Sequence, residues 1–430
     1  MTTTLRVAGA GTLALMVAAS AHAAAQTLER RVNNAPSGSV TFNFPSRSNT
    51  CGDGRYFFRA DGEMWYGNFN EVTRSISCER GPVRVLLVRD GRELLRIQTF
   101  VGPLSQEPNA TDLGAVSARE AADYLMSIAT DSDGRPARDA LTPAMTADGA
   151  PVSRDLLALA RDNSRPRELR RSALSWLVRR RSELGMSASE VSRMLTTIAR
   201  DETENRDVRT SAISSLSRLE TAEALNAIVD MAQQTSDTWL ATRAVHSLAS
   251  SGDPRARQHV RAAAERTDLS EEARAAAIQG LAGEYATSRD ATFLRDLYRK
   301  VGSDRLRDAT MTGAAQIGGT ETRDWLLSIA RSADEPIRNR RKAIELADRV
   351  GMTASDLSTL YDRIDDTEVR ASIITELAQN GTRVASDKLI SIARNDPSVM
   401  NRRRAVQALG RFDDPRVREA LRDLVQRSSS

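Results

Sequence analysis

The segment DPSVMNRRRAVQALG at residues 396–410 decides the fold of this chain. Its Asp-Pro pair is typical of a helix start, because aspartate accepts free N–H bonds and proline is tolerated in the first turn. Ala405, Val406 and Leu409 then occupy offsets 0, +1 and +4, which share one face of an α-helix. The segment predicts a helix with one buried face, whose alanine lets a neighbouring helix approach closely.

The same pattern recurs eight times, at intervals of 30 to 39 residues. An apolar residue follows each offset-0 position, which we call the register position, and a second apolar helix follows each register helix. Two helices in about 33 residues form a hairpin that cannot bury its apolar face alone. Stacking such hairpins on one another buries it, so the repeat predicts a quasi-one-dimensional solenoid. The register positions are Ala173, Ala212, Ala244, Ala277, Thr310, Ala343, Ile373 and Ala405.

These segments resemble HEAT-type α-solenoid repeats over roughly residues 150–426, and 396–410 is the best single match. The unit at Thr310 departs from the pattern, since it lacks both the alanine and the leucine. The resemblance implies a mainly α fold, a HEAT-like α–α solenoid of about eight helical hairpins. It also implies an extended concave surface, which we expect the second helices to line, that binds another protein.

An arginine stands three residues before the register position in seven of the eight units. Arginine supplies 58 of the 61 basic residues, which a GC-rich coding bias would explain. Two other interpretations are bidentate binding of carboxylates or phosphates and a structural ladder of ion pairs between repeats. The structural interpretation names Arg170, Arg209, Arg274, Arg307, Arg340, Arg370 and Arg402.

Residues 36–102 predict a small β-rich module with period-two alternation, such as Val40, Phe42 and Phe44. Apolar runs at 83–88 and 94–100 flank Asp90-Gly91 and predict a hairpin. Cys51 and Cys78 are the only cysteines of the chain. We expect them to form a disulfide that reinforces this small core; a reactive thiol is the alternative, but no base lies nearby.

Five further segments complete the expected organisation. Residues 1–25 read as a signal peptide, with Arg6, a short apolar run and two A-x-A cleavage candidates. Residues 103–116 carry turn and breaker residues typical of a linker. Divergent capping helices at 117–150, HEAT-like repeats at 151–426 and a disordered tail at 427–430 follow. We therefore expect a bacterial periplasmic or secreted protein that no longer inserts in the membrane once the signal is cleaved.

Residues for catalysis or cofactors are scarce. The chain has three histidines, and His246 and His259 both fall in the repeats without a ligand cluster around them. Pairs such as Asp365-Asp366 and Asp413-Asp414 sit in turns, where helix capping explains them. We expect no enzyme activity, no metal and no cofactor. The chain has 61 basic and 57 acidic residues, so its charge is nearly balanced. Nucleic-acid binding needs a concentrated positive face, and we therefore do not expect it here.

The sequence thus favours a non-catalytic exported scaffold or adaptor whose solenoid binds a protein partner. An alternative is an envelope glycan- or peptidoglycan-binding protein that uses Trp65-Tyr66 in the β module. A hydrolase with an unrecognised site is a third hypothesis. The identity of the partner and the ligand-binding residues do not follow from the pattern.

Overall fold

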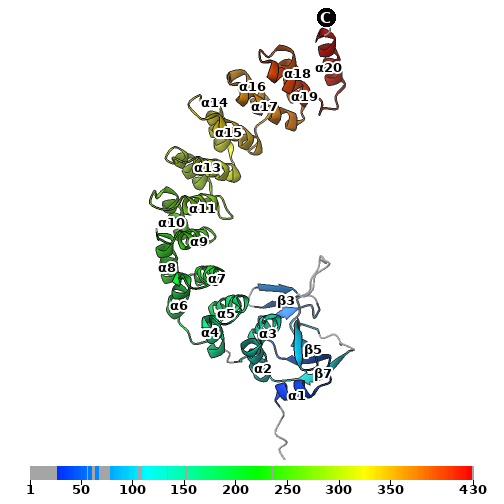
Figure 1. Cartoon of the computed structure of the whole chain (residues 1–430), viewed down its shortest axis with the longest axis vertical. Coiled ribbons are helices and arrows are strands. Elements are labelled where there is room, and N and C mark those ends of the chain that lie inside the picture. Colours follow the sequence, from blue (N-terminus) through cyan, green and yellow to red (C-terminus); the bar gives the residue numbers. More distant parts are fainter. Residues whose placement is uncertain are drawn as a thin grey trace, which may run out of the picture. The chain divides into compact units, whose positions relative to one another are not determined.

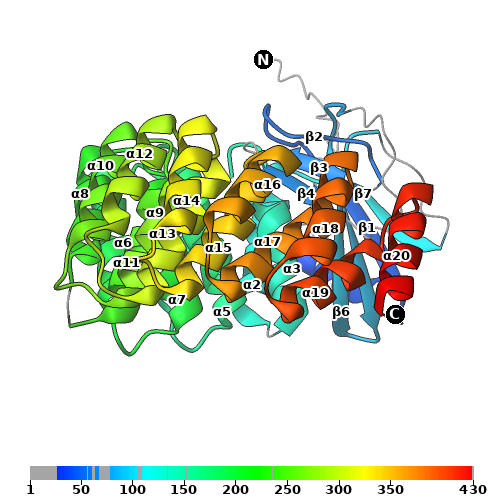
Figure 2. The same cartoon turned by 90° about the horizontal axis from the view of Figure 1, so that it is seen from above.

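A computed structural model describes residues 27–55, 57–60, 63–66, 78–103, 109–132, 134–150, 153–234 and 236–428. The expected signal peptide at 1–25 lies outside these residues. Two compact units make up the chain, Met1–Ala173 and Leu174–Ser430. The first contains the strands, and the second is a stack of helices (Figures 1 and 2). The mainly α fold with a small β-rich module is therefore confirmed.

The first unit is built on a four-stranded sheet of order β6-β5-β1-β7. β1 pairs antiparallel with β5, so that Phe42 faces Val85, and β5 forms the predicted hairpin with β6. Gly91 has a φ of +57° in the turn, a backbone conformation that glycine adopts without strain. The strands are β1 (Ser39–Phe44), β5 (Val83–Asp90), β6 (Glu93–Val101) and β7 (Ala110–Ala115).

A second sheet carries the predicted disulfide. Its order is β2-β3-β4, with β2 at Cys51–Gly52, β3 at Phe57–Ala60 and β4 at Glu63–Tyr66. Cys51 is bonded to Cys78, with their Cα atoms 5.1 Å apart. Next to this bond, Gly52 and Glu79 exchange two backbone hydrogen bonds of 2.9 Å. The disulfide prediction is confirmed. The side chains of Trp65 and Tyr66 lie outside the described part of the structure.

The prediction of a linker at 103–116 is wrong for residues 110–115. Residues 110–115 form β7, which runs parallel to β1 with Ser39 opposite Ala110. The sequence Ala-Thr-Asp-Leu-Gly-Ala has no apolar alternation, but an edge strand is held mainly by backbone hydrogen bonds and tolerates polar residues. The Val116 amide continues this pairing by donating to the Asn43 carbonyl at 2.8 Å. Residues 104–108 lie outside the described residues.

The helices expected to cap the solenoid belong to the first unit. α2 (Ala118–Asp131) and α3 (Gly134–Thr146) pack against each other, and α3 packs on β6 and β5. Tyr124 of α2 meets the Phe42 ring of β1 edge-on, with centroids 6.2 Å apart. The Arg47 amide donates to the Thr146 carbonyl at 3.1 Å. A short helix, α1 (Leu28–Asn34), completes this unit with Leu28 and Val32 buried.

Two series of helices alternate along the rest of the chain. The boundary between the two units falls inside α5. The register helices are α5 (Arg167–Arg180), α7 (Arg206–Ser217), α9 (Thr238–Ala249), α11 (Glu271–Leu281), α13 (Asp304–Ile317), α15 (Ile337–Arg349), α17 (Thr367–Asn380) and α19 (Val399–Leu409). The even-numbered helices are α4 (Ser153–Arg161), α6 (Ala188–Arg200), α8 (Ala222–Ala232), α10 (Pro254–Glu265), α12 (Ser288–Tyr298), α14 (Thr320–Arg331), α16 (Ala354–Arg363), α18 (Arg383–Asn395) and α20 (Pro415–Ser428).

Burial confirms the helical register. All eight register residues, from Ala173 to Ala405, are fully buried. Thr310 replaces alanine without leaving its hydroxyl unsatisfied, because it donates to the Arg307 carbonyl at 2.8 Å. The apolar residue at +1 is also buried in seven units, whereas Val406 of α19 is 38% exposed. Each register helix from α9 to α17 packs between the register helices before and after it.

The order of helices within a repeat differs from the expectation. Most register helices pack more extensively against the even-numbered helix before them than against the one after, as in α6 with α7 and α14 with α15; α17 packs equally on both. Within Leu174–Ser430, the odd-numbered helices form one layer and the even-numbered helices the other. Figure 1 shows the odd-numbered layer on the inner side of the curve of this unit, so the register helices line the concave side.

The C-terminal helix also ends later than expected. α20 begins at Pro415 after the predicted Asp-Pro signal, and the Asp414 carboxylate accepts the Arg416 amide at 2.9 Å. The helix continues through residues 427 and 428, which we expected in the disordered tail. Residues 429 and 430 lie outside the described part.

Candidate functional site

The seven repeat arginines share one kind of partner. Each donates a hydrogen bond to a backbone carbonyl at the end of the preceding even-numbered helix or just after it. Four of these carbonyls lie ten residues before the arginine and three lie six residues before it. The acceptors of Arg170, Arg209, Arg274, Arg307, Arg340, Arg370 and Arg402 are Ala160, Ala199, Ala264, Val301, Ala330, Ile364 and Asp396.

This geometry has a structural explanation. The last carbonyls of a helix lack intrahelical donors and carry the negative end of the helix dipole, so a guanidinium is favourable there. The Arg209 Nε–Ala199 O distance is 2.9 Å and the Arg340 Nε–Ala330 O distance is 3.0 Å. Carboxylates add a second partner at Arg209, where Asp237 lies 2.7 Å away, and at Arg370, where Asp396 lies 3.5 Å away. The common feature is thus a ladder of carbonyl hydrogen bonds, and ion pairs accompany it in places.

Buried carboxylates in the solenoid also have structural partners. Asp290 is fully buried at the start of α12 and caps it through the Thr287 amide at 2.9 Å. Arg257 and Arg261 of α10 bind the same carboxylate at 2.9 and 2.6 Å. Burial raises the pKa of Asp290, but the hydrogen bonds from Thr287 and the two arginines outweigh it and lower that pKa below its ordinary value. An acid that stays ionised and fully hydrogen-bonded suits a structural role better than general acid catalysis.

His246 and His259 lie on neighbouring helices, α9 and α10. Burial, followed by the charge of Arg243, lowers the pKa of His246. Among the described residues, no three His, Cys, Asp or Glu side chains gather closely enough to hold a metal ion. No helix in the described ranges is long and apolar enough to span a membrane.

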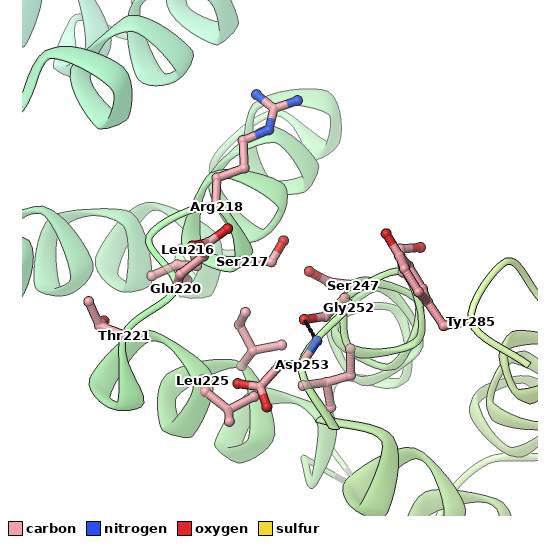
Figure 3. Close-up of a pocket in the computed structure, with 14 residues that line it drawn as sticks. Leu216, Ser217, Arg218, Glu220, Thr221, Leu225, Ser247, Gly252, Asp253 and Tyr285 are labelled. Carbon is pink, nitrogen blue, oxygen red and sulfur yellow. Dashed lines mark hydrogen bonds between the residues drawn. The ribbon is translucent and has the colours of Figure 1, made fainter. Parts of the chain in front are cut away.

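The strongest candidate site is a pocket of about 500 Å³ at the C-terminal ends of α7 and α9 (Figure 3). We call it the α7–α9 pocket. It lies where each register helix turns into the next even-numbered helix, and its far wall comes from the loop after α11. The lining residues are Leu216, Ser217, Arg218, Glu220, Thr221, Leu225, Ile228, Ser247, Leu248, Ser250, Ser251, Gly252, Asp253 and Tyr285.

The apolar part of the lining is the edge of the repeat core. Leu216, Ile228 and Leu248 are buried, and Leu225 is partly exposed. In Figure 3, Glu220 and Thr221 lie on one side of the pocket and Tyr285 lies on the opposite side. The Tyr285 side chain is 44% exposed, an unusual position for a large ring. The pocket therefore combines an apolar base with a polar and aromatic rim.

Many polar groups of the rim already have partners. Thr221 caps α8 by accepting the Ala224 amide at 3.2 Å, and Asp253 caps α10 by accepting the Arg255 amide at 2.8 Å. The Asp253 carboxylate also binds the Arg255 guanidinium at 2.7 Å. Arg218 donates to the Ser175 hydroxyl at 3.1 Å, and its side chain extends away from the pocket (Figure 3). These contacts leave Glu220 and Tyr285 as the groups to consider for a ligand.

A second hollow, of about 310 Å³, lies along the odd-numbered layer itself. It is lined from α15, α17, α19 and the residue Arg411 that follows α19. Arg341 donates to the Ser372 hydroxyl at 3.0 Å, and Arg404 lies 3.6 Å from the Glu368 carboxylate. The register helices therefore form a polar groove on their exposed side, in addition to burying their apolar side in the core.

The sequence reasoning did not identify either hollow. Asp253 and Pro254 begin α10, as an Asp-Pro pair is expected to begin a helix, and this pattern gives no sign of a pocket beside them. Tyr285 was hidden by its place in an irregular loop.

A sequence model described as HEAT repeats matches residues 192–282 and 357–430. These ranges run from α6 to the end of α11 and from α16 to the C-terminus. A search of curated protein sequences found no match.

Solved structures with similar stacks include human deoxyhypusine hydroxylase, at 17% identity and a TM-score of 0.25, covering 61% of this chain and 97% of that one. The CpcE–CpcF complex of a Nostoc phycocyanin lyase has 15% identity and a TM-score of 0.27, with 61% and 93% covered. Importin beta has 13% identity and a TM-score of 0.33, with 70% and 52% covered. At these values the solved structures carry no argument about function.

Proposed function

We propose that this HEAT-like α-solenoid protein is a non-catalytic adaptor of the cell envelope, which binds a protein partner along its odd-numbered helices. The observation that carries the proposal is the hollow along α15, α17 and α19. Consecutive repeats there contribute side chains to one continuous surface. Repeat stacking places such surfaces side by side, which gives a partner many small contacts.

A protein fits this surface better than a nucleic acid does. The chain carries 61 basic and 57 acidic residues, and many of the arginines are already bound to carbonyls or carboxylates. Phosphate-driven binding needs a concentrated basic face. A protein partner instead needs an area of roughly 800 Å² with mixed polar and apolar chemistry.

Export is part of the same proposal. The signal-like residues 1–25 support it, as does the Cys51–Cys78 disulfide, because disulfides persist in oxidising compartments. N-terminal sequencing of the natively expressed protein tests it. We expect the mature chain to begin just after Ala23 or Ala25, and a chain that still begins at Met1 would contradict export through this signal.

Site-specific photo-crosslinking in living cells tests the binding surface. A photoreactive amino acid replaces one exposed residue at a time on the odd-numbered layer, at Ser214, Thr312 or Gln379. Matched controls are the exposed even-layer residues Asn226, Thr292 and Ser391. We expect the same protein adduct from the odd-layer positions only. Adducts restricted to the even layer, or none from any position, would refute the proposed surface.

A further inference from the structure

The Glu220 carboxylate has an unusual setting at the α7–α9 pocket. Glu220 has a φ of +53°, the one positive value among the described residues other than glycine. Glycine is the usual residue in this left-handed conformation, and another side chain there costs about 1 kcal/mol. Within the described residues, the Glu220 carboxylate has neither a hydrogen bond nor an ion pair. A strained position that holds a free carboxylate beside a cavity suggests a role in binding.

Tyr285 offers the complementary half of a site. Its ring stands at the opposite side of the pocket, and a side chain at Gly252 would touch that ring at 3.5 Å. Because residue 252 is a glycine, no side chain from that position contacts the Tyr285 ring. An exposed tyrosine face attracts a cation within about 6 Å, and an arginine can also stack on it.

Between these two groups the base of the pocket is apolar. Leu225, Ile228 and Leu248 line it, and the Asp253 carboxylate at its edge is already paired with Arg255. Lysine and arginine side chains combine an aliphatic stem with a cationic head, so they fill such a pocket with both parts satisfied. A neutral apolar side chain would leave Glu220 without a partner.

We propose that the α7–α9 pocket binds a basic side chain, arginine or lysine, of the protein partner. This inference rests on the proposed function, because it names the group by which the partner is anchored. The cationic head pairs with the Glu220 carboxylate, and the Tyr285 ring bounds the side chain from the opposite side of the pocket. The stem covers the leucine and isoleucine side chains at the base.

Methyl NMR on the full chain provides the test. The probe is the acetylated and amidated tripeptide Ala-Arg-Ala, and its control replaces arginine with citrulline, which keeps the shape and loses the charge. We expect saturable shifts at the methyl groups of Leu225, Ile228 and Leu248. The citrulline peptide should bind about three- to tenfold more weakly. Equal binding of the two peptides, or shifts confined to other regions, would overturn the proposal.

Variants assign the effect to the two residues. Glu220→Gln and Tyr285→Leu should each weaken the arginine peptide about three- to fivefold. Glu223→Gln is the matched control, because Glu223 is an exposed acid three residues further on that does not line the pocket. Glu220→Gly should fold at least as stably as the parent, since glycine suits the backbone, and should still lose the peptide. Unchanged binding in Glu220→Gln would refute the assignment.

The pocket and the proposed function can fail separately. If the photo-crosslinked adducts form at the odd-layer positions but the arginine peptide does not bind, the pocket assignment is wrong and the adaptor function stands. If no adducts form while the peptide binds with the expected charge dependence, the pocket stands and the proposed surface is wrong.

Discussion

The Tyr361 hydroxyl donates a 2.6 Å hydrogen bond to the Asp396 carboxylate and so joins α16 to the turn after α18. The same relationship occurs two repeats earlier, where Tyr298 donates to Glu335 at 2.7 Å. Burial, followed by the hydrogen bond to the carboxylate, raises the pKa of both tyrosines. Each tyrosine therefore stays a protonated donor at neutral pH, and its bond links one even-numbered helix to the end of the next.

Tyr361→Phe should lower the free energy of unfolding by about 1–3 kcal/mol, because the buried Asp396 carboxylate loses a donor. Urea unfolding followed by circular dichroism measures the change. Tyr285→Phe is the control, since its exposed hydroxyl should matter by no more than about 0.5 kcal/mol. Equal stability of the two variants would show that the Tyr361 bond contributes nothing.

Arg340→Gln should destabilise the protein by about 1–3 kcal/mol, because it removes the donor to the Ala330 carbonyl at the end of α14. Arg338→Gln is the matched control two residues away. Arg338 is exposed and pairs with Asp304 and Asp308, so its loss should cost less than about 1 kcal/mol. A larger effect at Arg338 would contradict the structural role of the repeat arginine.

Ala277→Glu should cost several kcal/mol, enough to melt the central repeats, because it places an unpaired charge against a neighbouring helix. Ala277 is fully buried in α11, whereas Gln279 of the same helix is exposed. Gln279→Glu adds the same charge and should melt like the parent in circular dichroism. A wild-type melt for Ala277→Glu would mean that the register is wrong.

Glu376→Gln should stabilise the protein at pH 7. Glu376 is 9% exposed on α17, and burial, followed by the charges of Asp348 and Glu345, raises its pKa. A raised carboxyl pKa means that the ionised form costs stability at neutral pH, and this cost disappears as protonation occurs at lower pH. Thermal melts should show a gain in Tm at pH 7 that shrinks towards pH 4. A gain that is constant with pH would exclude this cause.

Cys51→Ser with Cys78→Ser should destabilise the first unit by roughly 3–4 kcal/mol, on the loop-entropy estimate for this separation. Calorimetry of the variant and of the parent, with and without reductant, measures the change. Reductant should lower the stability of the parent and leave the variant unchanged. A variant as stable as the oxidised parent would show that the disulfide contributes nothing.

The solenoid could be predicted because its signal is local and repeated. Positions such as Ala277 and Ala343 needed only helical spacing, and their burial followed. The pairing of helices was harder, since both neighbours of a register helix are apolar and similar in length. The choice between them depends on turn geometry, which the repeat pattern does not encode.

The β unit and the pocket show what local patterns miss. β7 was hidden because its pairing with β1 joins residues about 70 positions apart and depends on backbone atoms. Glu220 and Tyr285 are 65 residues apart in the sequence, and the stacked helix ends bring them to opposite sides of one pocket. Neither residue type is unusual alone, and only the folded chain shows their common cavity.

Nearest-neighbour stacking also governs how the second unit responds to force. Each repeat packs on the repeats before and after it, as α15 does on α13 and α17, whereas the Arg340–Ala330 bond closes a single repeat. A pull along the stack is therefore shared among interfaces in series. We therefore expect the unit to extend under force by separating single interfaces between repeats and to shorten again when the force is removed.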